Sequence, residues 1–144
     1  MQAAPEVSAD LAGQLRLAAL RLLRRLRSEY GPEGLSAVQF SALSSLYRNG
    51  SMSPRELAVL EQVQPPTVTR LIASMERADL VTRRVHPRDR RQLVIELTPS
   101  GTKLIASATD CSDHWFATHL AALTDDERAV IAGAIPIINK IVSE

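Results

Sequence analysis

The chain has 144 residues, which suffices for one ordinary domain with a buried core but not for several independent domains. Its composition is 45% hydrophobic but only 3% aromatic, which favours packed helices over a β-sandwich. Seventeen basic and sixteen acidic residues nearly cancel, so a nucleic-acid site must come from local charge. Cys111, the single cysteine, excludes an internal disulfide, and no apolar stretch has the length of a membrane span. We expect one mainly α-helical domain over residues 1–144, located in the cytoplasm and without contact to a membrane.

The N-terminal segment predicts a long amphipathic helix. Ser8 can cap it and Gly31-Pro32 can end it. Its apolar positions recur every three or four residues, at Leu11, Leu15, Ala18, Leu22 and Leu26. Five arginines within residues 16–27 fall mainly off this stripe, and the simplest interpretation is a solvated face.

Three shorter helices follow, each with a recognisable start. Ser36 with Gln39 and Ser53 with Glu56 are capping-box patterns, and Leu57 and Leu60 should point inward from the second of these helices. Pro65 opens the third helix, predicted over residues 65–78, with an apolar stripe at Val68, Leu71, Ile72 and Met75. Its opposite face and flanks are small, polar or basic: Pro66, Thr67, Thr69, Arg70, Ala73, Ser74 and Arg77.

A hairpin is predicted next. Residues 80–85 form the first strand, with Val81 and Val85 on one side, and the second strand alternates at Leu93, Ile95 and Leu97. The connection, residues 86–91, contains three arginines. Over residues 70–91 there are seven arginines against three acids, so positive charge is concentrated here.

Two further helices are predicted at the C-terminal end. The first begins at Thr98-Pro99 and carries an apolar stripe at Leu104, Ile105, Ala108, Cys111, Trp115 and Leu120. The second begins with a capping box at Thr124, and Pro136 should kink it or end it early.

A short helix, a turn and a helix with threonine and arginine on its outer face are typical of a helix-turn-helix, whose second helix enters the major groove of DNA. The hairpin strengthens this interpretation, because a basic tip can reach phosphates or the minor groove. Thr67, Thr69 and Arg70 are candidates for base contacts, and Arg88, Arg90 and Arg91 for phosphate and minor-groove contacts. Asp89 should pair with a neighbouring arginine, most simply Arg91, and fix the tip. His86 is interpreted as a solvated turn residue or a phosphate contact.

Residues 53–101 resemble the winged helix-turn-helix of the MarR family. The resemblance is carried by Asp89-Arg90-Arg91 followed by Leu97-Thr98 and Gly101, and it covers roughly residues 36–104. It implies a homodimer, with dimerisation helices at 8–35 and 99–144 and a DNA-binding region at 36–98, on a pseudo-palindromic duplex. It also implies a repressor, Arg91 in the minor groove and Asp89 as its brace.

The resemblance further implies release by a small aromatic or phenolic ligand. Candidate lining residues for such a ligand cleft are Tyr30, Tyr47, His114 and Trp115, although packing explains the aromatic residues equally well. Two departures from the family pattern stand out. Gln64 replaces a Ser or Thr cap, and Ala78-Asp79 stands where a glycine is common.

The sequence gives weaker signals for other function classes. Redox sensing through Cys111 is an alternative, but a thiol on an apolar helical stripe is usually inert core. A metal site at Cys111, His114 and His119 is disfavoured within one chain, because Cys111 and His119 would lie about 12 Å apart. No phosphate loop, nucleophile elbow or HExxH motif indicates an enzyme, and no cofactor is implied. A protein-interaction module without DNA affinity is the remaining alternative.

Overall fold

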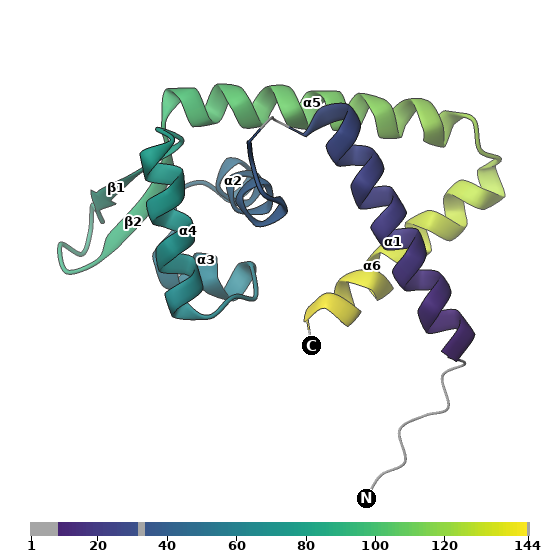
Figure 1. Ribbon diagram of the computed structural model, residues 1–144, viewed down its shortest axis with the longest axis horizontal. Helices are drawn as coiled ribbons and strands as arrows, with labels where there is room; N and C mark the ends of the chain where they lie inside the picture. The colour runs from purple at the N-terminus through teal and green to yellow at the C-terminus, as the bar shows by residue number, and fades with distance from the viewer. Residues whose placement is uncertain (1–8, 32–33, 144) are drawn as a thin grey trace, which may run out of the picture. The chain divides into compact units, whose positions relative to one another are not determined.

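The computed structural model describes residues 9–31 and 34–143, which form six helices and one two-stranded antiparallel sheet (Figure 1). In chain order the elements are α1 (Ala9–Tyr30), α2 (Ala37–Asn49), α3 (Pro54–Leu60), α4 (Pro65–Arg77), β1 (Val81–Val85), β2 (Leu93–Leu97), α5 (Pro99–Ala121) and α6 (Asp125–Ser143). The predicted fold class is confirmed. Ser8 and Pro32, the predicted cap and end of the first helix, lie outside the described residues.

The chain divides into two compact units, Met1–Thr109 and Asp110–Glu144, with the boundary inside α5. The first unit contains the predicted helix-turn-helix and hairpin, and the second contains α6. Unfolding of the whole chain as one cooperative domain stays a prediction. Helix α6 continues through Pro136 to Ser143, so the predicted early end is wrong.

The helices start as their sequences predict. The side chains of Ser36 and Gln39 form the reciprocal bonds of a capping box at α2, and Ser53 and Glu56 do so at α3. By contrast, Gln64 makes no side-chain cap bond, so α4 depends on its N-terminal proline and on packing.

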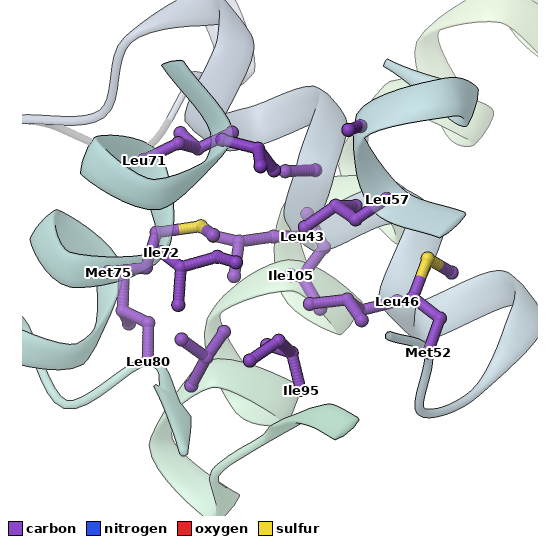
Figure 2. Packing of buried hydrophobic residues seen from close by; sticks show 14 residues of the cluster. Leu43, Leu46, Met52, Leu57, Leu71, Ile72, Met75, Leu80, Ile95 and Ile105 are labelled. Carbon is purple, nitrogen blue, oxygen red and sulfur yellow. The ribbon is translucent and has the colours of Figure 1, made fainter. Parts of the chain in front are cut away.

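The core of the first unit gathers large side chains from α2, α3, α4, the hairpin and α5. The fully buried ones are Leu43, Leu57, Ile72, Met75, Ile95 and Ile105 (Figure 2). The predicted stripe of α4 is entirely buried. Leu60 is 51% exposed rather than inward, and Ala58 is buried in α3 instead.

The hairpin pairs Val81 with Leu97 and Val85 with Leu93, and Ile95 forms an additional bridge to Met52. Only its base reaches the core. Val81 and Ile95 are buried, whereas Val85, predicted on the same side of the strand as Val81, is 55% exposed. The reason is geometric, since the tip projects beyond the helices (Figure 1).

Helices α3 and α4 both end in a Schellman turn in which a residue other than glycine takes the left-handed conformation. At the end of α4, Leu80 N donates to Met75 O and Asp79 N donates to Glu76 O, which is the Schellman pattern. Asp79 takes the left-handed conformation at φ 56°, where glycine is favoured. The glycine absent from residues 78–79 is therefore replaced without loss of the turn, at the cost of backbone strain.

The turn after α4 is fixed by Thr98, which follows β2 at the base of the hairpin. Thr98 donates its backbone N–H to Leu80 O at 3.0 Å and its hydroxyl to Asp79 O, while its hydroxyl accepts from Gly101 N at 2.9 Å. A Cβ at Gly101 would lie 2.0 Å from Leu80 O. We call residues 78–80 with 98–101 the corner.

Replacing Gly101 with alanine should open the corner, because its Cβ would meet backbone and not a flexible side chain. We expect Gly101→Ala to lower the free energy of unfolding by roughly 2–3 kcal/mol. Gly13 lies inside α1, and a Cβ added there would meet open space. The matched change Gly13→Ala should therefore raise the free energy of unfolding by about 0.5–1 kcal/mol. Urea unfolding at one fixed protein concentration measures both. Equal effects of the two changes would contradict the close approach.

Candidate nucleic-acid interface

Helix α4 presents opposite faces to the core and to solvent. Val68, Leu71, Ile72 and Met75 are buried. The predicted DNA-binding residues Pro66, Thr67, Thr69, Arg70 and Arg77 are all exposed. The α3–α4 turn that sets this face is a second Schellman turn, in which Val63 N donates to Ala58 O and Gln62 takes φ 53°.

The hydroxyl groups on α4 differ in their availability. Thr69 Oγ1 donates to Pro65 O at 2.9 Å, so it retains only acceptor capacity for another group. Ser74 is half-buried, and its hydroxyl donates to Leu71 O at 2.7 Å and accepts from Gln39 Nε2 at 3.0 Å. Ser74 thus links α4 to α2, a contact that the helical pattern alone did not indicate.

The loop between the strands, residues 86–92, is held by its own polar groups. His86 N donates to Gln92 O at 2.9 Å and Gln92 N donates to Asp89 O at 3.0 Å. The Asp89 carboxylate accepts from Arg91 N at 3.1 Å and from Gln92 Nε2 at 3.2 Å. We call residues 86–92 the wing loop.

The predicted ion pair between Asp89 and Arg91 is replaced by a contact to the backbone. Asp89 holds the amide of Arg91, and no ion pair joins it to an arginine among the residues that the structure describes. A carboxylate two residues before an amide readily forms this local turn, which leaves the guanidinium group available.

The arginines of residues 70–91 form two groups. Arg83 pairs with Glu76 of α4 at 3.0 Å, and Arg84 pairs with Glu96 across the hairpin. Within the described ranges no acidic side chain pairs with Arg70, Arg77, Arg88, Arg90 or Arg91, and all five are exposed. The positive charge that remains available therefore lies on the outer face of α4 and on the wing loop.

The predicted ligand-cleft residues belong to different units. Tyr47 is exposed in the first unit, and the side chain of Tyr30 lies outside the described residues. In the second unit the Trp115 ring stacks on His119 at 4.0 Å and meets Phe116 edge-on at 5.3 Å, while His114 is exposed. A pocket of about 530 Å³ contains none of the four predicted residues; it is lined by Asn49, Ser51, Met52, Arg55, Glu56, Val59 and Leu60.

Cys111 is exposed, contrary to its predicted place in a core stripe, and the described part of its unit, Asp110–Glu144, contains only the end of α5 and α6. Across residues 9–31 and 34–143, no group of three or more His, Cys, Asp or Glu side chains is arranged to hold a metal ion. The same described ranges contain no helix whose length and apolarity suit it to cross a membrane.

Asp89 should affect DNA binding through the wing loop backbone, and two substitutions separate this effect from its charge. Asp89→Asn keeps an oxygen for Arg91 N and removes a negative charge, so affinity for duplex DNA should hold or rise up to about threefold. Asp89→Ala removes both oxygens and should weaken binding by about fivefold to tenfold. Fluorescence anisotropy with a labelled duplex measures both. Tighter binding by the alanine variant would show that only the charge matters.

Comparison with known proteins agrees with this geometry. Residues 35–93 match the model of the MarR family. The chain is 37% identical over 136 residues to an HTH-type transcriptional regulator of Mycobacterium leprae, covering 94% of this chain and 95% of that protein. A MarR family protein from Bacillus stearothermophilus has a TM-score of 0.77 and 26% identity, with 94% and 95% of the two chains covered. Bordetella bronchiseptica BpsR, at 22% identity, shares the fold with a TM-score of 0.74 over 98% and 99% of the chains. The chain therefore belongs to the MarR family of winged helix-turn-helix, DNA-binding transcriptional regulators and is not an enzyme.

Proposed function

We propose that this protein is a homodimeric repressor that binds a pseudo-palindromic DNA operator in the cytoplasm. Each subunit would insert α4 into the major groove and place the wing loop at the neighbouring phosphates and minor groove. The observation that carries the proposal is the set of exposed arginines without acidic partners on these two elements, among the residues described.

The two elements would have different tasks. Thr67, Thr69 and Arg70 lie on the outer face of α4, where short polar groups and a guanidinium can reach base edges. Pro66 and Arg77 flank them along the same helix, and Ser74 would act by fixing α4 on α2. The wing loop arginines, Arg88, Arg90 and Arg91, would bind by charge and hold the protein in register.

This division gives a test with two arginine substitutions. Arg91→Ala should weaken binding to operator and random duplex alike, and it should reduce the salt slope by about one phosphate contact. Arg70→Ala should weaken operator binding by roughly tenfold or more, with a smaller effect on random duplex. Binding of both variants to both duplexes across a salt series measures this. Equal losses on the two duplexes for both variants would contradict the assignment.

The homodimer is supported by apolar surface on the terminal helices, each considered separately. On α1, six leucines are largely exposed: Leu11, Leu15, Leu17, Leu20, Leu22 and Leu23. Helix α6 has no buried residue and exposes Val130, Ile131, Ile135, Ile137, Ile138, Ile141 and Val142. Apolar faces of this extent are characteristic of surfaces that a second subunit covers.

A charge on α6 should separate the subunits without unfolding one of them. Ile137 is 63% exposed in the single chain, so Ile137→Glu should cost little there, but it would bury an unpaired charge in a dimer. We expect the dimer dissociation constant to rise on the order of a hundredfold, with a parallel loss of operator binding. Analytical ultracentrifugation measures the former. Asn139→Glu, on the polar face of the same helix, is the control; an unchanged dimer in the Ile137 variant would exclude α6 from the interface.

Release from DNA by a small aromatic ligand is the regulatory part of the proposal. The structurally similar BpsR has its DNA binding regulated by 6-hydroxynicotinic acid. Here the ligand would shift the spacing or tilt of the two wings and so select a conformation with low operator affinity. Operator binding measured with added 6-hydroxynicotinic acid and simple phenolic acids tests this. A compound that bound without changing operator affinity would contradict its role as an effector.

A further inference from the structure

His86 occupies an unusual position at the start of the wing loop. Its side chain is half-buried, and its Nδ1 lies 3.2 Å from Arg88 N and 3.1 Å from Asp89 N. Both neighbours are backbone donors. An imidazole nitrogen accepts hydrogen bonds only when it carries no proton, so this geometry requires the neutral ring with its proton on Nε2.

The bonds of His86 complete a chain of side-chain acceptors along the wing loop. His86 holds the amides of Arg88 and Asp89, and Asp89 in turn holds the amide of Arg91. These amides lie beyond the strand ends, at Val85 and Leu93, so no ladder bond can fix them. The side chains of His86 and Asp89 therefore set the backbone from which the three wing loop arginines extend.

We propose that His86 is a positioning residue of the DNA interface, which uses its unprotonated Nδ1 to fix the wing loop in its DNA-binding shape before DNA arrives. The inference rests on the proposed DNA-binding function of the wing loop. A loop that is already ordered loses less conformational entropy on binding, and this difference appears as affinity. The ring need not touch DNA for this role.

Asparagine offers a close chemical substitute for the acceptor. Its Oδ1 is separated from Cα by the same number of bonds as Nδ1 of histidine, and asparagine commonly accepts from amides two residues ahead. His86→Asn removes the ring but keeps the acceptor, whereas His86→Ala removes both. The pair separates the hydrogen bonds of His86 from its size and from any contact of Nε2 with phosphate.

The test combines the free protein with DNA binding. In the free protein, long-range proton–nitrogen NMR correlations should show Nδ1 of His86 unprotonated and Nε2 protonated. Amide exchange at residues 88 and 89 should be slow in the wild type and in His86→Asn, and fast in His86→Ala. Affinity for a short mixed-sequence duplex at low salt should fall about tenfold in His86→Ala and stay within about threefold in His86→Asn.

Two results would overturn the inference. One is a His86→Asn variant as weak as His86→Ala, which would assign the effect to the ring. The other is a His86→Ala variant with wild-type affinity, which would make the two bonds irrelevant to binding. If the wild-type protein bound no duplex at any salt, the proposed function would fail, and the NMR signals would still report separately whether His86 holds the loop.

Discussion

One hydroxyl group, that of Thr98, joins the elements of the proposed DNA interface. It donates to Asp79 O, just after α4, and accepts from Gly101 N in the first turn of α5. Thr98 N adds a bond to Leu80 O, immediately before β1. The end of α4, the base of the hairpin and the start of α5 are thus fixed in one corner. The angle between the outer face of α4 and the wing loop depends on this corner.

The close approach at the corner explains why small and polar residues stand there. Gly101 lies so near Leu80 O that no side chain fits. Asp79 takes the left-handed conformation in a turn that is held by two backbone hydrogen bonds to the end of α4, from Asp79 N to Glu76 O and from Leu80 N to Met75 O. Strain at one residue is compatible with stability when several neighbouring bonds determine its conformation. The corner therefore fixes the outer face of α4 and the base of the hairpin relative to the core of the first unit.

The charged side chains of residues 70–96 have two different roles. Arg83 and Arg84 pair with Glu76 and Glu96 and so stabilise the attachment and the pairing of the hairpin. The wing loop uses Asp89 in another way, since its carboxylate binds backbone N–H groups. The net charge of the chain is only +1, yet within residues 70–91 the exposed arginines without an acidic partner lie on α4 and the wing loop. Local hydrogen bonding, more than total charge, determines the candidate interface.

The sequence predicted those features that depend on local chemistry or on periodicity. The caps at Ser36 and Ser53 and the buried stripe of α4 are examples, because side-chain type and spacing determine them. The sequence did not reveal the exposure of Val85 and Leu60, since burial depends on how far neighbouring elements extend.

Other features were missed because they require the folded backbone. The left-handed residues Gln62 and Asp79 carry no glycine signal, and the acceptor role of His86 becomes visible only when the amides of residues 88 and 89 turn toward its ring. The contact predicted between Asp89 and Arg91 was wrong in kind for the same reason, since an ion pair was expected where Asp89 binds the backbone amide of Arg91.

The most direct test of the proposed function is selection of bound duplexes from a random-sequence library by the purified protein. A dimer with one recognition helix in each half-site should enrich an imperfect inverted repeat, with half-site centres about one helical turn, roughly 10 base pairs, apart. Enrichment of such a repeat would establish sequence-specific binding by two symmetric units. A bound pool indistinguishable from the starting library would contradict a sequence-specific regulator of this form.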